Sequence, residues 1–296
     1  MAWFVSARTC PIQSMFNPQA SFIRSPPNWH LARVFGNPLF CNAIPSNPPI
    51  SREVSQEVFK NIPWSLNSEN YWPSKEAIAT WRDADAVCFD FDSTVCLDEG
   101  IDELAVFCGA GAEVAEWTAK AMTGLVEFEE ALAARLSLFK PSLDQVENCL
   151  EQRPPRISPG ISELIGKLKA KNVDVYLISG GFRQMIKPVA LELGIPPDNI
   201  FANQLLFGTS GGYVGFDPKE PTSRSGGKAV AVQHIRQKRG YKTLVMIGDG
   251  ATDLEARQPG GADMFICYGG VQMRESVARK ADWVVSDFHE LMIQLS

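Results

Sequence analysis

Short apolar runs typical of β-strands recur along the chain from residue 74 onward, and each is followed by a segment of helical character. The runs span residues 86–91, 173–178, 244–247, 264–267 and 283–285. Behind the second run, for example, Ile186, Val189 and Leu193 lie at helical spacing before Gly194. Strands that alternate with helices predict a Rossmann-like α/β fold, in which a parallel sheet carries helices on both faces.

The segment between the first two of these strands has helical spacing but no strand pattern. Its apolar residues are Ile101, Leu104 and Cys108, then Val114, Trp117 and Ala121, then Phe128, Leu132 and Leu136, and finally Val146 and Leu150. This predicts a helical cap, residues 97–158, inserted into a core domain formed by residues 74–96 and 159–296. Since ligands bind beyond the carboxyl ends of parallel strands, a cap that leaves after the first strand can cover such a site. A Gly-rich turn at 208–212 predicts a hairpin within residues 200–216, beside the main sheet.

The first 73 residues differ in composition from the rest. Residues 1–52 contain four arginines and no acidic residue, and six Ser and eight Pro fall in the same stretch without periodic apolar spacing. This composition is typical of an organelle transit peptide with a disordered linker, and the low density of Arg favours the chloroplast over the mitochondrion. An ordinary disordered tail is the alternative. A secretory signal is disfavoured because no continuous apolar segment follows a basic start.

The charged residues and the cysteines limit the classes of function. Lys and Arg number 28 against 34 Asp and Glu, so the net charge of -6 does not supply the basic surface that nucleic-acid binding needs. No apolar stretch is long enough to predict a membrane span. Seven cysteines without a C-x-x-C pair predict reduced thiols, and none of the three histidines has metal-ligand spacing. Any metal is therefore expected to have oxygen ligands.

Acidic residues follow two of the predicted strands. Asp90 and Asp92 stand at the end of the first strand, and Asp249 follows the third strand between two glycines. An isolated Asp pair is more typical of an ordinary turn. Together, however, the three carboxylates form a hard oxygen site suited to Mg²⁺. A calcium EF-hand is excluded, because its loop needs Gly at position six and Glu at position twelve.

Two further elements carry groups that bind phosphate. Ser179 and Gly180 follow the second strand just before a predicted helix, and Lys228 begins another helix after a Ser-Gly-Gly turn. Each alone is an ordinary turn or cap, but their coincidence with the acidic clusters in one α/β pattern predicts an anion site at helix N-termini. There Asp90 is placed to attack phosphorus, and Asp92 to act as general acid and base. A cysteine phosphatase is excluded, since no Cys has Arg six positions later.

These motifs resemble, in order and spacing, the haloacid dehalogenase superfamily of aspartyl phosphatases, over the chain from about residue 74 to its end. The motifs are Asp90-Phe91-Asp92-Ser93-Thr94, Ser179, Lys228 and Gly248-Asp249-Gly250-Ala251-Thr252-Asp253. Segments 92–94, 101–104, 178–182 and 201–203 are similar to the phosphoserine phosphatase family in particular. That resemblance implies Mg²⁺-dependent hydrolysis of O-phospho-L-serine to L-serine and phosphate through an aspartyl-phosphate, the last step of phosphorylated serine biosynthesis.

The resemblance also implies roles for individual residues. Asp90 would be the nucleophile and Asp92 the acid and base, while Mg²⁺ would be held by Asp90, the main-chain carbonyl of Asp92, and Asp249. The phosphate-binding residues would be Ser179, Gly180, Lys228 and Thr252. Many family members carry Asn where this chain has Thr252, whose hydroxyl can still contact phosphate or a metal-bound water.

The substrate's amino-acid end would be recognised by residues of the cap. The resemblance implies that Glu99 faces the ammonium, that Arg135 faces the carboxylate, and that Met122 and Phe128 close the apolar side. Without the resemblance, Glu99 and Arg135 would be interpreted as solvated charges, and Met122 and Phe128 as core of the cap.

Two alternative functions stay open at this point. The same machinery can serve another small phosphomonoester, such as a phosphoamine or a sugar phosphate, or the scaffold can be a binding module that senses phosphate or Mg²⁺. The intact pair of Asp90 and Asp92 argues against a pure binder, which needs no acid and base. A small-molecule substrate is expected, with no nucleic-acid or membrane partner, and the sequence allows a homodimer.

Overall fold

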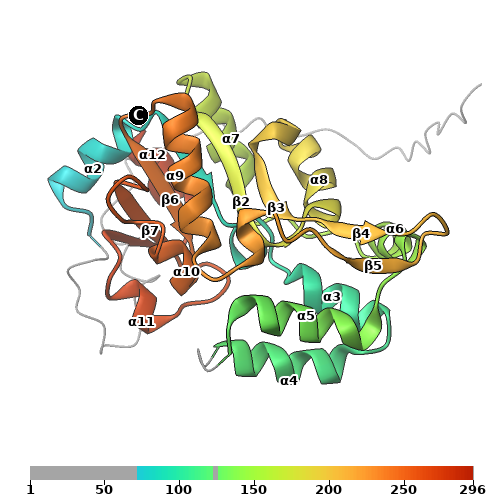
Figure 1. The fold of residues 1–296 in the computed structure, drawn as a ribbon. Coiled ribbons are helices and arrows are strands. Elements are labelled where there is room, and N and C mark those ends of the chain that lie inside the picture. The colour runs from blue at the N-terminus through green and yellow to red at the C-terminus, as the bar shows by residue number, and fades with distance from the viewer. Residues whose placement is uncertain (1–71, 123–125, 296) are drawn as a thin grey trace, which may run out of the picture. The chain divides into compact units, whose positions relative to one another are not determined.

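The structure is a computed structural model, which describes residues 72–122 and 126–295. Its centre is a six-stranded sheet in the order β3-β2-β1-β6-β7-β8, with every neighbouring pair parallel (Figure 1). The strands are β1 (Ala86–Phe89), β2 (Asp174–Phe182), β3 (Ile200–Asn203), β6 (Leu244–Gly248), β7 (Met264–Tyr268) and β8 (Trp283–Val285). The predicted α/β architecture is confirmed. Nearly all of the segment predicted as a transit peptide lies outside the described residues.

Helices cover both faces of this sheet. One face carries α2 (Lys75–Arg82), α7 (Ile161–Ala170), α8 (Arg183–Glu192) and α12 (Phe288–Gln294), and the other carries α9 (Gly227–Arg239), α10 (Ala251–Leu254) and α11 (Glu275–Ala278). In β1, Val87 and Phe89 pack into the first hydrophobic cluster, whereas Ala86 and Cys88 pack into the second. A strand buried on both faces needs apolar residues at every position, which explains its continuous apolar run.

Two strand ends differ from the sequence prediction. The first strand ends at Phe89 rather than Phe91, because the chain turns after Asp90 and Ser93 adopts a left-handed φ of 55°. The second strand continues past residue 178 to Phe182, because a register shift lets its last residue pair with β3. Ser179 therefore lies within β2, and the helix that follows begins only at Arg183.

The insertion after β1 is helical, as predicted. It contains α3 (Gly100–Phe107), α4 (Gly111–Met122), α5 (Phe128–Phe139) and α6 (Leu143–Gln152). Leu104, Leu132 and Leu136 form its core, which includes Phe182 and Met185 from the sheet domain. The cap thus packs directly over the carboxyl end of β2.

Two chain crossings join the cap to the sheet domain. They lie side by side, because Cys96 forms an antiparallel bridge with Ile157 and the Leu97 N–H donates to the Arg156 carbonyl at 2.8 Å. The predicted hairpin is also present as β4 (Leu205–Phe207) and β5 (Tyr213–Phe216). It packs against the cap's core rather than into the clusters of the main sheet.

Other expectations concern the membrane and the cysteines. Within the described residues, no helix has both the length and the apolar character that a membrane span requires. All five described cysteines have free thiols, and Cys108 alone among them is not fully buried. Reduced, mostly buried thiols are thus confirmed for the part of the chain that the structure describes.

Candidate active site

The carboxyl ends of three adjacent strands bring the predicted motif residues together. In the central strand β1, Phe89 lies opposite both Leu177 of β2 and Ile247 of β6. The residues just beyond this level therefore meet at one edge of the sheet, where the Asp90 N–H donates to the Ile247 carbonyl at 2.8 Å. These strands are parallel and pair without a register shift at this level, so the residues that follow them lie together as a direct result of the topology.

Lys228 lies between two carboxylates at this edge. Its Nζ is 2.8 Å from Asp90 Oδ1 and 2.6 Å from Asp253 Oδ1, and all three side chains are buried. Burial alone would lower the pKa of Lys228, but the charges of Asp253 and Asp90 raise it above its usual value. Burial also raises the pKa of Asp253 to about 7, and the charge of Asp90 adds to this effect. The lysine is therefore a fixed cation beside the predicted nucleophile.

Asp249 is held by a second cation. It follows β6, is buried, and forms an ion pair with Arg274, which precedes α11. The carboxylates of Asp90, Asp249 and Asp253 each offer an oxygen within 4.8 Å of the others. Three buried carboxylates at this spacing are a donor set suited to a hard divalent cation such as Mg²⁺. The site thus fits a hard divalent cation, but the third carboxylate of the cluster is Asp253 and not Asp92, whose side chain is hydrogen-bonded to other residues instead.

Asp92 lies in a different environment from Asp90. The Gly100 N–H donates to its Oδ1 at 2.8 Å, and the Ser179 hydroxyl donates to its Oδ2 at 3.0 Å. Burial raises the pKa of Asp92 to about 7, and the charges of Glu99 and Asp90 contribute to the rise. A carboxyl group with this pKa can both give and accept a proton near neutral pH.

The Gly180-Gly181 pair is explained by close packing. A Cβ on Gly181 would lie 2.7 Å from Asp92 Oδ2, and one on Gly180 would lie 3.0 Å from the Phe128 ring. The Gly181 N–H donates to Ser179 Oγ at 2.8 Å, so this amide already has a partner within β2. The Gly180 carbonyl is fixed by the Asn203 side-chain amide, which donates to it at 2.7 Å. These contacts let the cap approach the backbone directly.

Glu99 stands at the junction of the sheet domain and the cap. It immediately precedes α3, is partly buried, and accepts a hydrogen bond of 2.7 Å from the Ser93 hydroxyl. Burial raises the pKa of Glu99, and the charge of Asp90 acts in the same direction. The interpretation of Glu99 as a fully solvated charge is therefore excluded by its surroundings.

Arg135 is a buried cation on α5, with 8% of its surface exposed. Its Nε donates to the Ala131 carbonyl at 3.2 Å and one terminal nitrogen donates to Thr118 Oγ1 at 3.5 Å. Among the described residues, no carboxylate lies within ion-pair distance of it. Burial lowers its pKa, and the more distant charges of Asp102, Glu99 and Asp92 only partly oppose this shift. A buried guanidinium without an ionic partner is costly, and it is suited to an anionic ligand.

The other predicted site residues differ in how close they lie to this edge of the sheet and in how far the structure describes them. Phe128, the first residue of α5, is half-buried and its ring lies against Gly180. Met122 ends α4, but its side chain is outside the described part of the structure. Thr252 lies in α10 with an exposed side chain, so its contact with phosphate stays a prediction.

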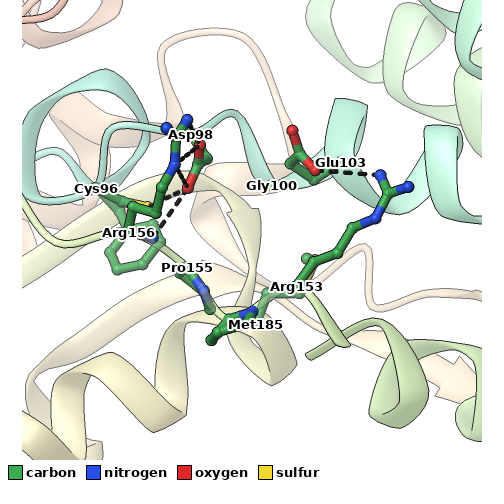
Figure 2. Close-up of a pocket in the computed structure, with 10 residues that line it drawn as sticks. Cys96, Asp98, Gly100, Glu103, Arg153, Pro155, Arg156 and Met185 are labelled. Carbon is green, nitrogen blue, oxygen red and sulfur yellow. Dashed lines mark hydrogen bonds and ion pairs between the residues drawn. The ribbon is translucent and has the colours of Figure 1, made fainter. Parts of the chain in front are cut away.

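A separate cavity of about 300 Å³ lies at the chain crossings between cap and sheet domain (Figure 2). Its lining includes Cys96, Gly100 and Met185. Its charged residues pair with one another, Arg156 with Asp98 and Arg153 with Glu103. None of the predicted catalytic or phosphate-binding residues lines it, so this cavity is not the candidate active site.

Two charged residues of the site were missed by the sequence prediction. Asp253 had a recognisable signal, because it ends the same Gly-Asp motif four positions after Asp249, but it was assigned no role from the sequence. Arg274 had none, since a loop after β7 brings it to Asp249.

Comparison with known proteins shows which family the chain resembles. A family model described as haloacid dehalogenase-like hydrolase matches residues 84–261. The chain is 66% identical over 254 residues to a protein named chloroplastic phosphoserine phosphatase from Arabidopsis thaliana, and the alignment covers 86% of each chain. It is 51% identical over 212 residues to phosphoserine phosphatase from Mus musculus, covering 72% of this chain and 93% of the mouse protein.

Solved structures give the same result. The structure of a phospho-aspartyl intermediate analogue of phosphoserine phosphatase is similar with a TM-score of 0.62 and 29% sequence identity. The similarity covers 72% of this chain and 100% of that one. The aligned part of this chain thus matches the full length of that protein.

Proposed function

The chain belongs to the phosphoserine phosphatases of the haloacid dehalogenase-like hydrolase family, and from this we propose that it hydrolyses O-phospho-L-serine to L-serine and inorganic phosphate. In metabolism this reaction is the last step of serine synthesis by the phosphorylated route. The observation that carries the proposal is the pairing of two unlike carboxyl groups. Asp90 forms an ion pair with Lys228 at 2.8 Å, and burial raises the pKa of Asp92 to about 7.

The two carboxyl groups divide the reaction into two steps. In the first, an oxygen of Asp90 forms a bond to phosphorus, the bond from phosphorus to the serine oxygen breaks, and Asp92 gives its proton to the departing alkoxide. In the second, Asp92 takes a proton from water, the water oxygen bonds to phosphorus, and the acyl phosphate bond to Asp90 breaks. Each group then has its initial protonation state. Lys228 and Ser179 bind the phosphoryl oxygens throughout.

Phosphatases of this family are metal-dependent, and we assign Mg²⁺ to this chain. Asp90, Asp249 and the main-chain carbonyl of Asp92 would hold the ion, with Asp253 close enough to contribute directly or through water. When bound, the ion supplies positive charge for the phosphoryl oxygens. Chelation should abolish phosphate release and Mg²⁺ should restore it. Restoration by another divalent ion but not by Mg²⁺ would refute this assignment.

Substrate recognition is assigned to the cap. Arg135 has the burial and the free charge that a substrate carboxylate needs, and Glu99 provides a negative group for the ammonium. Phe128 closes the apolar side, and Met122 is assigned the same role from the family resemblance alone. A zwitterionic phosphomonoester uses both charges, whereas a phosphoamine uses only Glu99 and a sugar phosphate uses neither.

A phosphate-release screen tests the substrate assignment. Phosphoserine, phosphothreonine, phosphoethanolamine and several sugar phosphates are compared by kcat/KM with Mg²⁺ present. We expect phosphoserine to be the best substrate and the sugar phosphates to be the poorest. A sugar phosphate that is hydrolysed faster than phosphoserine would refute the proposed specificity, and no hydrolysis of any substrate would favour the binding-module alternative.

We propose that the enzyme acts in the chloroplast and that residues 1–73 contain its transit peptide. Support comes from the acid-free, Pro-rich composition of residues 1–52 and from the chloroplastic name of the Arabidopsis relative. A fluorescent protein fused behind residues 1–73 should accumulate in plastids of plant cells. Diffuse cytosolic or mitochondrial fluorescence would contradict this proposal.

The domain organisation and the oligomeric state are also proposals. We assign residues 74–96 and 159–296 to the catalytic core and 97–158 to the cap, which places both boundaries at the two adjacent chain crossings. A homodimer is a further prediction, and the mass measured by light scattering at micromolar concentration tests it directly.

A further inference from the structure

Ser225 connects the cap to the segment that carries Lys228. Its Oγ donates to Glu127 Oε2 at 2.7 Å and also lies 3.1 Å from Glu129 Oε2. The same oxygen accepts the Phe128 N–H at 3.2 Å, and the Ser225 N–H donates to Glu129 Oε2 at 3.0 Å. We call this group of contacts, between Ser225 and residues 127–129, the Ser225 clamp. It joins the first turn of α5 to the loop before α9.

On the cap side, the clamp fixes a wall of the candidate active site. Phe128 lies between the two glutamates in sequence, and its ring packs against the backbone of Gly180. Gly180 follows Ser179, whose hydroxyl contacts the acid Asp92. Any shift of the start of α5 would therefore change the space next to the phosphate-binding strand.

On the other side, a closely packed stretch of backbone connects the clamp to Lys228. Gly227 packs so closely on the Pro221 carbonyl that a Cβ would lie 2.0 Å from its oxygen. Gly226 adopts a left-handed φ of 72° before the helix begins. A backbone held this tightly between Ser225 and Lys228 transmits the position of one residue to the other.

We propose that Ser225 is a positioning residue, which sets the distance between the apolar wall at Phe128 and the phosphate-binding Lys228 and thereby favours substrate binding. This inference rests on the phosphatase function proposed above and adds to it a residue outside the predicted catalytic, metal-binding and substrate-binding groups. The clamp joins two parts of the fold that are otherwise linked through the chain crossings and the core of the cap.

Because the clamp contains two glutamates, its contacts depend on the charge and the hydrogen-bond donors of the side chain at position 225. Serine offers one hydroxyl proton and one amide proton to the carboxylates of Glu127 and Glu129. Hydrogen bonds from its own backbone and from Ser225 lower the pKa of Glu129, so this carboxylate stays charged at neutral pH. An aspartate at this position would bring a third negative charge and no side-chain proton. It should disturb the clamp more than alanine does.

The test compares Ser225→Ala and Ser225→Asp with the parent enzyme. For Ser225→Ala we expect KM for phosphoserine to rise about 3- to 10-fold, as lost hydrogen bonds of this kind typically produce. The value of kcat should stay within about two-fold, since Asp90 and Asp92 are untouched. Ser225→Asp should raise KM further. The matched control is Ser137→Ala, which removes an exposed hydroxyl that bonds within α5, to the Ala134 carbonyl, and should change neither constant.

Amide hydrogen exchange of residues 126–134 without substrate gives a readout independent of activity. Exchange should be faster in Ser225→Ala than in the parent and in Ser137→Ala, because the Phe128 N–H loses its acceptor. If the parent enzyme did not hydrolyse phosphoserine, the proposed function would be refuted. The exchange measurement would still show whether Ser225 holds the start of α5 in place. An unchanged KM for phosphoserine in Ser225→Ala would overturn the inference, whether or not the exchange rate changes. An equal loss of kcat and kcat/KM would also overturn it, because Ser225 would then act in the chemical step and not in substrate binding.

Discussion

The sheet edge and the cap meet at the candidate active site, but the buried cations that they contribute are partnered in opposite ways. At the sheet edge, Lys228 lies between Asp90 and Asp253, and Arg274 pairs with Asp249. In the cap, Arg135 is buried with only neutral acceptors among the described residues.

This difference suits the sheet edge to the chemical steps and the cap to recognition of the substrate. The charges at the sheet edge are paired with one another, so the predicted catalytic groups are held in place before any substrate arrives. The charge of Arg135 lacks such a partner, and a ligand carboxylate would supply it. We therefore expect substitutions at the sheet edge to affect every phosphomonoester, and substitutions in the cap to affect substrates according to their charged groups.

The largest effect is expected at the nucleophile. Asp90→Asn should reduce phosphate release at least about 10³-fold for every substrate, because an amide cannot attack phosphorus. A steady-state phosphate assay measures this, and thermal unfolding checks that the variant is folded. Asp144→Asn, at an exposed site in the first turn of α6, is the matched control and should retain full activity. A folded Asp90→Asn enzyme with near-normal turnover would refute the assignment.

The acid should give the next largest effect, with a dependence on the leaving group. Asp92→Asn should slow phosphoserine hydrolysis by about 10²- to 10⁴-fold, but an aryl phosphate less, because a good leaving group needs less protonation. In the parent, kcat/KM for phosphoserine should fall as pH rises through about 7, where Asp92 loses the proton it must donate. This limb should be absent in the variant. Equal losses on both substrates would contradict the acid role.

A smaller and more selective effect is expected in the cap. Arg135→Ala should lower kcat/KM for phosphoserine about 10- to 100-fold, since a charge-assisted contact is typically worth about 1.5 to 3 kcal/mol. Phosphoethanolamine lacks the carboxylate, and its slower hydrolysis should be nearly unchanged. Arg153→Ala removes a half-exposed arginine of the cap as the control. If both substrates lose activity by the same factor in Arg135→Ala, the arginine is structural and the distinction between the two regions fails there.

No effect on either region is expected from removal of the N-terminal segment. A chain that begins at Trp72 keeps Ser74, which caps α2, and Trp81, whose indole donates to the Leu291 carbonyl at 3.0 Å. It should have the kcat, KM and unfolding temperature of the full chain. Insolubility or lost activity of this shorter chain would mean that residues before Trp72 belong to the core.

The sequence predicted much of the fold because its signals are local. Periods of two and 3.6 residues and an apolar run buried on both faces identified the sheet, its helices and the helical insertion. The ends of β1 and β2 were less well predicted. Ser93 takes a left-handed conformation without being Gly, and β2 continues through two glycines because of pairing with β3. Such pairing depends on a strand that is distant in sequence.

For the site, the sequence by itself determined which candidate residues stand at the ends of strands and the starts of helices. Asp90, Asp92, Ser179, Lys228 and Asp249 were recognisable because each stands at a strand end or helix start in a fixed order, and parallel topology brings such positions to one edge.

Tertiary structure alone decided the environment of each group. It raised the pKa of Asp92 to about 7, brought Arg274 to Asp249, buried Arg135 without an ionic partner, and joined Ser225 to the cap. The physical reason is that pKa values and ion pairs depend on desolvation and on distances of a few ångströms between residues far apart in the chain. Local sequence patterns do not encode those distances.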